Sequence, residues 1–184
     1  MDLMSSKFVR GFREGGFTLI EILVVLVLLT GTGFVLMTNY FALKSKQALL
    51  NDVHKFQVLV DEARSKSVAV DSGLAWGVYV DVRTKENYAT VFSFDPSVNF
   101  KYSSIPKTSN SLVLSSGVNF EKPLKSGGQR LFLTFNKLTG YPVLYPAKSE
   151  IKDQLNLTLV NQQWSAFLTV DSSGSTSVSK LFKN

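Results

Sequence analysis

The stretch EGGFTLIEILVVLVLLTG, residues 14–31, sets one carboxylate, Glu21, inside an otherwise apolar run. No Asp, Glu, Lys, Arg or His occurs in residues 22–43. As an α-helix, a segment of this length extends about 33 Å, which exceeds the roughly 30 Å hydrocarbon core of a bilayer. We therefore predict a membrane-spanning helix with a carboxylate near its first turn.

The segment before the apolar run is short and basic. Lys7, Arg10 and Arg13 precede the run, and positively charged flanks are retained on the cytoplasmic side of a membrane. The amino terminus is therefore expected in the cytoplasm and the bulk of the chain outside it. A cleavable secretory signal has a shorter apolar core followed by small residues, whereas Gly15 and Gly16 precede the run. This order argues against an ordinary secretory signal.

The cost of a carboxylate in hydrocarbon requires an explanation for Glu21. At a bilayer centre the charge costs roughly 2.5–3.5 kcal/mol, and it is tolerated mainly where it meets a cation or is buried against protein. A different explanation is that Glu21 reaches the membrane interface from the helix end and stabilises its own first turn through the helix dipole. The residues alone leave both explanations open.

The sequence GGFTLIEILVVLVLL resembles the class III leader of type IV pilins and type II secretion pseudopilins, which ends in Gly and is followed by Phe and a hydrophobic helix with Glu at its fifth position. The resemblance implies that a prepilin peptidase of the inner membrane cleaves between Gly16 and Phe17 and methylates the new amino terminus. It also implies that Glu21 pairs with the Phe17 amine of a neighbouring subunit during assembly of a helical filament.

Composition limits the classes of function. The chain has 184 residues, of which about 140 follow the apolar run, enough for one domain with a single core. It has no cysteine, which excludes disulfides, thiolate metal sites and cysteine nucleophiles. The formal net charge is +6, a modest basic excess and not a nucleic-acid-binding tail.

Helical periodicity continues beyond the apolar run. Apolar or small residues recur every three or four positions, or at a multiple of that spacing: Leu49, Val53, Phe56, Val60, Ala63 and Val70. Charged residues fall between them: Lys46, Asp52, Lys55, Asp61, Glu62 and Arg64. This pattern predicts an amphipathic helix that continues the membrane helix. We therefore expect a leader at 1–16, a transmembrane helix at 17–43, a stem helix at 44–70 and a β-rich domain at 71–184.

Residues after 73 have the composition of strands. Segments 76–82 and 88–94 are rich in β-branched and aromatic residues and predict a hairpin. Further strands are predicted at 112–114, 131–135, 141–145, 155–160 and 166–170, and the polar segment 95–111 is predicted to be an exposed loop. The expected fold class is α+β, with one long amino-terminal helix packed on antiparallel sheet in a pilin-like arrangement.

Three later segments narrow the resemblance. The sequences SGLAWGVYV, LTFNKLTGYPV and AFLTVDSSGSTSV resemble the GspH/FimT-type domain of minor pseudopilins, whereas segment 95–130 has no counterpart that aligns. The resemblance implies a structural subunit of a type II secretion pseudopilus or, alternatively, a minor pilin of a type IV pilus. Its implied partners are the other pilins or pseudopilins of the fibre, the prepilin peptidase and the inner-membrane assembly platform.

No catalytic or metal site is predicted. The single histidine, His54, lies on the stem helix, and Asp52, two positions away, points to another face. The aspartates are scattered without the dense spacing of a calcium loop, and SGG at 126–128 lacks the context of a phosphate-binding loop. We expect a protein that is not an enzyme and that uses no cofactor.

Basic residues in the second half of the chain define a rival function. They are Lys122, Lys125, Arg130, Lys148, Lys152, Lys180 and Lys183. On one common face they would attract nucleic-acid phosphates, as in a pilin used for DNA uptake. Dispersed solvating charges are the favoured interpretation, so nucleic acid stays an alternative partner. A tethered domain that never assembles is the third alternative, and it leaves Gly16, Phe17 and Glu21 unexplained.

Overall fold

The computed structural model describes residues 17–82, 87–95, 111–122, 130–145, 149–151, 153–179 and 181–183. In these ranges the chain forms one long helix, a short 3₁₀ turn and eleven strands. The helix α1 covers Leu19–Val68 and the 3₁₀ turn η1 covers Asp71–Gly73. The strands are β1 (Ala75–Asp81), β2 (Tyr88–Phe94), β3 (Ser111–Val113), β4 (Asn119–Lys122), β5 (Arg130–Phe135), β6 (Pro142–Tyr145), β7 (Ser149–Glu150), β8 (Gln154–Val160), β9 (Trp164–Asp171), β10 (Thr176–Val178) and β11 (Phe182–Lys183).

The chain divides into two compact units, Met1–Phe41 and Ala42–Asn184. In the first unit the described residues form the beginning of α1, and their apolar side chains are exposed throughout residues 19–34 and 36–41. Within the described ranges α1 is the only helix long and apolar enough to cross a bilayer, and none of its apolar stretch is buried. An apolar helix surface of this extent, with no protein covering it, is suited to lipid.

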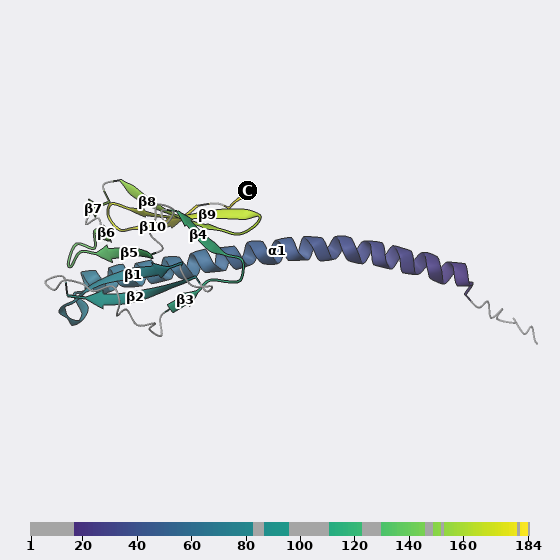
Figure 1. Cartoon of the computed structure of the whole chain (residues 1–184), viewed down its shortest axis with the longest axis horizontal. Coiled ribbons are helices and arrows are strands. Elements are labelled where there is room, and N and C mark those ends of the chain that lie inside the picture. Colours follow the sequence, from purple (N-terminus) through teal and green to yellow (C-terminus); the bar gives the residue numbers. More distant parts are fainter. Residues whose placement is uncertain are drawn as a thin grey trace, which may run out of the picture. The chain divides into compact units, whose positions relative to one another are not determined.

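In the second unit, α1 packs against two antiparallel sheets (Figure 1). Sheet A has the strand order β3-β2-β1-β5-β6-β7, and sheet B has the order β10-β9-β8-β4, with β11 also pairing with β9. The helix contributes Leu49, Val53, Phe56, Val60 and Ala63 to the core, where they meet apolar residues of both sheets. The predicted α+β fold, with a long helix packed on antiparallel sheet, is therefore confirmed.

Strand β1 lies at the centre of sheet A because it pairs with β2 on one side and with β5 on the other. The predicted hairpin is present, with Ala75 opposite Phe94 and Asp81 opposite Tyr88. Side chains alternate along β1, so Val78 joins the core beside the helix while Tyr79 joins a separate aromatic cluster. This alternation explains why the segment is apolar on both faces.

The carboxyl end of α1 is held by a buried serine. The Ser67 hydroxyl accepts a hydrogen bond from the Trp76 N–H (2.9 Å) and donates one to the Phe135 carbonyl (3.0 Å), which ties the helix to β1 and β5. The helix ends at Val68, two residues earlier than predicted, because Val70 adopts a left-handed conformation with φ 53°.

The charged residue Asp52 is an exception to the predicted amphipathic pattern. It is buried on the inner face of α1, where its carboxylate accepts bonds from the Ser115 N–H (2.7 Å) and the Ser115 hydroxyl (3.1 Å). A buried charge is tolerated when hydrogen bonds satisfy it. Strands β4, β7 and β11 were not predicted, and β10 was implied only by the resemblance to the GspH/FimT-type domain. The predicted loop 95–111 lies outside the described residues except at its two ends.

Two turns from different sheets meet at one side chain of α1. The turn around Gly140 follows β5 and the turn around Gly174 follows β9, and both approach Arg64 closely. Arg64 donates a hydrogen bond from Nη2 to the Ser173 carbonyl (3.1 Å). We call the contact of Arg64, Gly140 and Gly174 the turn junction, because it links both sheets to the helix.

Asp171, at the start of the turn that contains Gly174, predicts a dependence of stability on pH. Hydrogen bonds hold the pKa of the Asp171 carboxyl below its usual value. The largest effect comes from the Ser173 hydroxyl, and the N–H groups of Ser175 and Ser173 add to it. A carboxyl whose pKa is lowered by folding stabilises the fold at pH values above its pKa in the unfolded chain, about 3.9. This contribution is lost as the pH falls through its pKa in the folded chain. In urea unfolding of the full chain in detergent, followed by tryptophan fluorescence, the unfolding free energy should fall more steeply below about pH 5 than that of Asp171→Asn. Equal slopes would show that Asp171 carries no such linkage.

The division into two units predicts that the second folds without the first. Every core residue of the described chain lies at position 49 or beyond. A chain of residues 44–184 should therefore be soluble, monomeric and cooperative in urea unfolding. A broad, non-cooperative transition would mean that the apolar helix contributes to the folded core.

Candidate functional site

The first turn of α1 is closed by reciprocal hydrogen bonds between Thr18 and Glu21. The Glu21 Oε2 atom accepts bonds from the Thr18 N–H and the Thr18 hydroxyl, both at 3.1 Å. The Glu21 N–H donates to the Thr18 hydroxyl oxygen at 3.3 Å. This arrangement is a capping box, in which a Thr and a Glu three residues later satisfy otherwise unpaired N–H groups of the helix start.

The capping box fixes the direction of the carboxylate. Both bonds from Thr18 end on Oε2, and in the described ranges no residue bonds to the other oxygen, Oε1. A carboxylate has lone pairs for about four hydrogen bonds, so a cation can bind Glu21 without displacing Thr18. The two explanations for Glu21 are therefore compatible: it stabilises its own first turn and retains an oxygen for a partner.

The residue before Thr18 is equally accessible. Phe17 is 82% exposed, and Gly16, the other residue of the predicted cleavage site, lies outside the described residues. Thr18 was not predicted as a functional residue from the sequence, although the spacing Thr-x-x-Glu before an apolar run is a recognisable helix start.

Residues 11–30 match the family model described as the prokaryotic N-terminal methylation motif. Neither the comparison with curated proteins nor that with solved structures found a match. The matched residues include Gly16, Phe17 and Glu21, and they overlap the start of the apolar helix. Together the motif and the α+β fold support a type IV pilin-like protein that is anchored in a membrane.

The motif also indicates how such a chain is handled. It implies processing by a prepilin peptidase and assembly with other pilins, and pilin-like proteins are typically not enzymes. The single histidine, His54, is exposed on α1. Among the described residues there is no group of three or more His, Cys, Asp or Glu side chains that could hold a metal ion.

The predicted basic residues occupy separate strands where the structure describes them. Arg130 begins β5 of sheet A, and its Nε lies 3.7 Å from the buried carboxylate of Asp81. Lys122 ends β4 at one edge of sheet B, whereas Lys183 lies on β11, beyond β9 on the opposite side. Lys125, Lys148, Lys152 and Lys180 lie outside the described residues. The three described positions are not neighbours in either sheet.

Proposed function

We propose that this chain is a minor pseudopilin of the GspH/FimT type and a structural subunit of a type II secretion pseudopilus. The observation that carries the proposal is the methylation motif at residues 11–30, placed at the start of a helix whose later half packs on antiparallel sheets. In a membrane-anchored chain, this arrangement presents a processed helix end to neighbouring subunits.

The later sequence segments support the GspH/FimT subtype. LTFNKLTGYPV forms the second half of β5, a glycine turn and the first half of β6, and AFLTVDSSGSTSV forms most of β9, a glycine turn and β10. Strand β10 pairs antiparallel with β9, with Thr176 opposite Val170, at an edge of sheet B. A near-terminal strand, a glycine turn and a last strand are the features that the resemblance to this subtype implies.

The mechanism that we propose uses Phe17 and Glu21. The leader 1–16 stays in the cytoplasm, the helix spans the inner membrane, and the domain lies on the extracytoplasmic side. Cleavage after Gly16 leaves a methylated, cationic amine on Phe17. The Glu21 carboxylate of one subunit meets the Phe17 amine of the next, and two charges that are costly in hydrocarbon neutralise each other. The other pilins and the assembly platform are the partners in this step.

A minor pilin of a type IV pilus is the second candidate, with DNA binding as one role. The basic excess favours it, because phosphate contacts are made by Lys and Arg. We expect no meaningful DNA affinity of the full chain in detergent at physiological salt, and only weak, steeply salt-dependent binding below it. Charge reversal at Lys180 and Lys183, or at Lys122 and Lys125, should reduce that weak binding. Sub-micromolar affinity at physiological salt would favour the DNA-uptake function instead.

Deletion of the gene in its native host separates the two candidates. The pseudopilin proposal predicts that export of the secreted proteins stops while surface pili and natural transformation persist. Re-expression of the intact chain should restore export. Loss of pili with intact export would overturn the proposal in favour of the pilus, and an unchanged phenotype in all three assays would favour a tethered domain that never assembles.

A further inference from the structure

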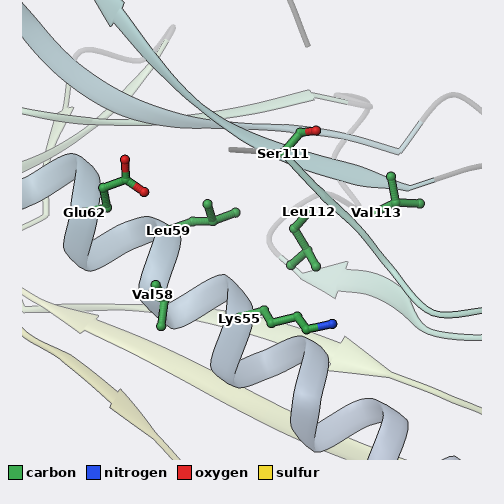
Figure 2. A pocket seen from close by; sticks show the side chains of 7 residues that line it. All are labelled: Lys55, Val58, Leu59, Glu62, Ser111, Leu112 and Val113. Carbon is green, nitrogen blue, oxygen red and sulfur yellow. The ribbon is translucent and has the colours of Figure 1, made fainter. Parts of the chain in front are cut away.

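A groove of about 530 Å³ lies between α1 and β3, the first strand in the order of sheet A. Figure 2 shows Leu59 of the helix and Leu112 of the strand pointing toward each other across it. Both are nearly buried, whereas Val58 is 63% and Val113 47% exposed. The groove thus has an apolar floor, and its lining also includes the polar residues Lys55, Glu62 and Ser111.

Among the described strands, only β2 pairs with β3, so one edge of β3 has backbone groups that no described strand uses. The Leu114 N–H donates to the Asn87 carbonyl (3.0 Å), so hydrogen-bonded pairs between β2 and β3 alternate from that point. The N–H and C=O groups of Leu112 therefore point toward β2, whereas those of Ser111 and Val113 point away from it. In the described part of the chain no strand pairs with this side of β3. Such an edge is a template for another strand.

The strand edge is held in place by the helix. The buried Asp52 carboxylate binds the N–H and hydroxyl of Ser115, two residues after β3 ends. This contact fixes the distance between β3 and α1, so the groove and the strand edge form one preorganised surface. Preorganisation lowers the entropy that binding costs.

The charges along the groove differ at its two ends. Glu62 is paired with Lys66, with Nζ and Oε1 2.6 Å apart. Lys55 is exposed, and no described residue forms an ion pair with it. The uncompensated charge of the groove is therefore positive and lies at Lys55. A carboxylate at that end of a bound segment would complement this charge.

We propose that the groove and the β3 edge bind an extended segment of another polypeptide, which adds as a strand to sheet A. Its backbone pairs with Ser111 and Val113, its helix-facing side chains are apolar and pack on Leu59 and Leu112, and an acidic side chain meets Lys55. Strand addition of this kind takes affinity from backbone bonds and specificity from alternate side chains. The inference goes beyond the proposed function, since it concerns a partner of the domain and not the membrane helix.

A library of random decapeptides, selected against the full-length chain in lipid nanodiscs, tests the proposal. The selected peptides should alternate apolar residues and be enriched in Asp or Glu. With Lys55→Glu as the target, the enrichment should change from acidic to basic residues. The matched control Lys44→Glu reverses an exposed charge of α1 outside the groove and should keep the acidic preference. No enrichment, or no change with Lys55→Glu, would overturn the proposal.

Val113→Pro tests the backbone edge independently. Its N–H points away from β2, so proline removes an edge donor without removing a bond to β2. Peptides selected on the unmodified chain should bind this variant at least tenfold more weakly, while its urea unfolding midpoint stays close to that of the parent. Undiminished binding to Val113→Pro would exclude strand addition. These binding results do not depend on cleavage at Gly16, so they can fail while the proposed function holds.

Discussion

Glu21→Ala should be inserted into the membrane and cleaved after Gly16, yet fail to assemble. Removal of a charge makes insertion of the apolar helix easier. In the fibre that we propose, however, the variant would leave the Phe17 amine of a neighbour buried without its carboxylate. Loss of one partner of a buried ion pair costs about 3–5 kcal/mol, which corresponds to more than a hundredfold loss of assembly. Crosslinking to the other pilins in native membranes, together with export of secreted proteins, measures this effect.

Two matched variants separate pairing from helix capping. Glu21→Gln keeps the shape and can still accept the Thr18 bonds, but it cannot neutralise an amine, so it should fail like Glu21→Ala. Thr18→Ala keeps the carboxylate and its bond from the residue 18 N–H but loses both bonds of the Thr18 hydroxyl, at a cost of about 1 kcal/mol. It should therefore assemble far better than either Glu21 variant. If Glu21→Gln assembles normally and Thr18→Ala does not, Glu21 acts through its own first turn.

Gly174→Ala should strongly destabilise the domain. Gly174 has φ 81°, and a Cβ atom there would collide with the Gly140 carbonyl oxygen and would lie 2.9 Å from Arg64 Nε. The left-handed conformation costs an alanine about 1–2 kcal/mol, and overpacking adds about 1–3 kcal/mol. We expect a loss of about 2–5 kcal/mol in urea unfolding, followed by the fluorescence of Trp76 and Trp164.

Gly117→Ala is the control for the turn junction. Gly117 also has a positive φ, 85°, but nothing lies within 4 Å of the position of an added Cβ. This variant should lose only the conformational cost of about 1–2 kcal/mol. The difference between the two alanine variants then measures the close contact of the two turns. Equal losses would show that the turn junction contributes nothing beyond the backbone conformation.

Local sequence patterns predicted most of the fold. The apolar run, the helical spacing after it and the hairpin at 76–94 depend on residues near each other in the sequence, and all correspond to described elements. Asp52 was misplaced because periodicity assigns charge to the outer face, whereas its partner Ser115 lies 63 positions away. The approach of Gly140 and Gly174 to Arg64 is equally non-local, so no pattern in the sequence indicates it.

The candidate sites also differ in whether they depend on neighbouring residues or on contacts between distant segments. Glu21 was predicted from its place in a short motif, and the Thr18 bonds follow from spacing within one turn. The groove was not predicted, because it requires β3 to be the edge strand beside Val58 and Leu59, and strand order is set by contacts between distant segments. The spatial relation of basic residues on β4, β5 and β11 likewise depends on topology.

Mass spectrometry of the amino terminus tests the central claim most directly. The chain is purified from native membranes of cells with active prepilin peptidase and compared with Gly16→Val, whose bulky side chain should block cleavage. The account predicts that the parent chain begins at Phe17 and carries one added methyl group, whereas Gly16→Val begins at the original amino terminus and carries none. A parent chain that retains residues 1–16 intact would contradict the account.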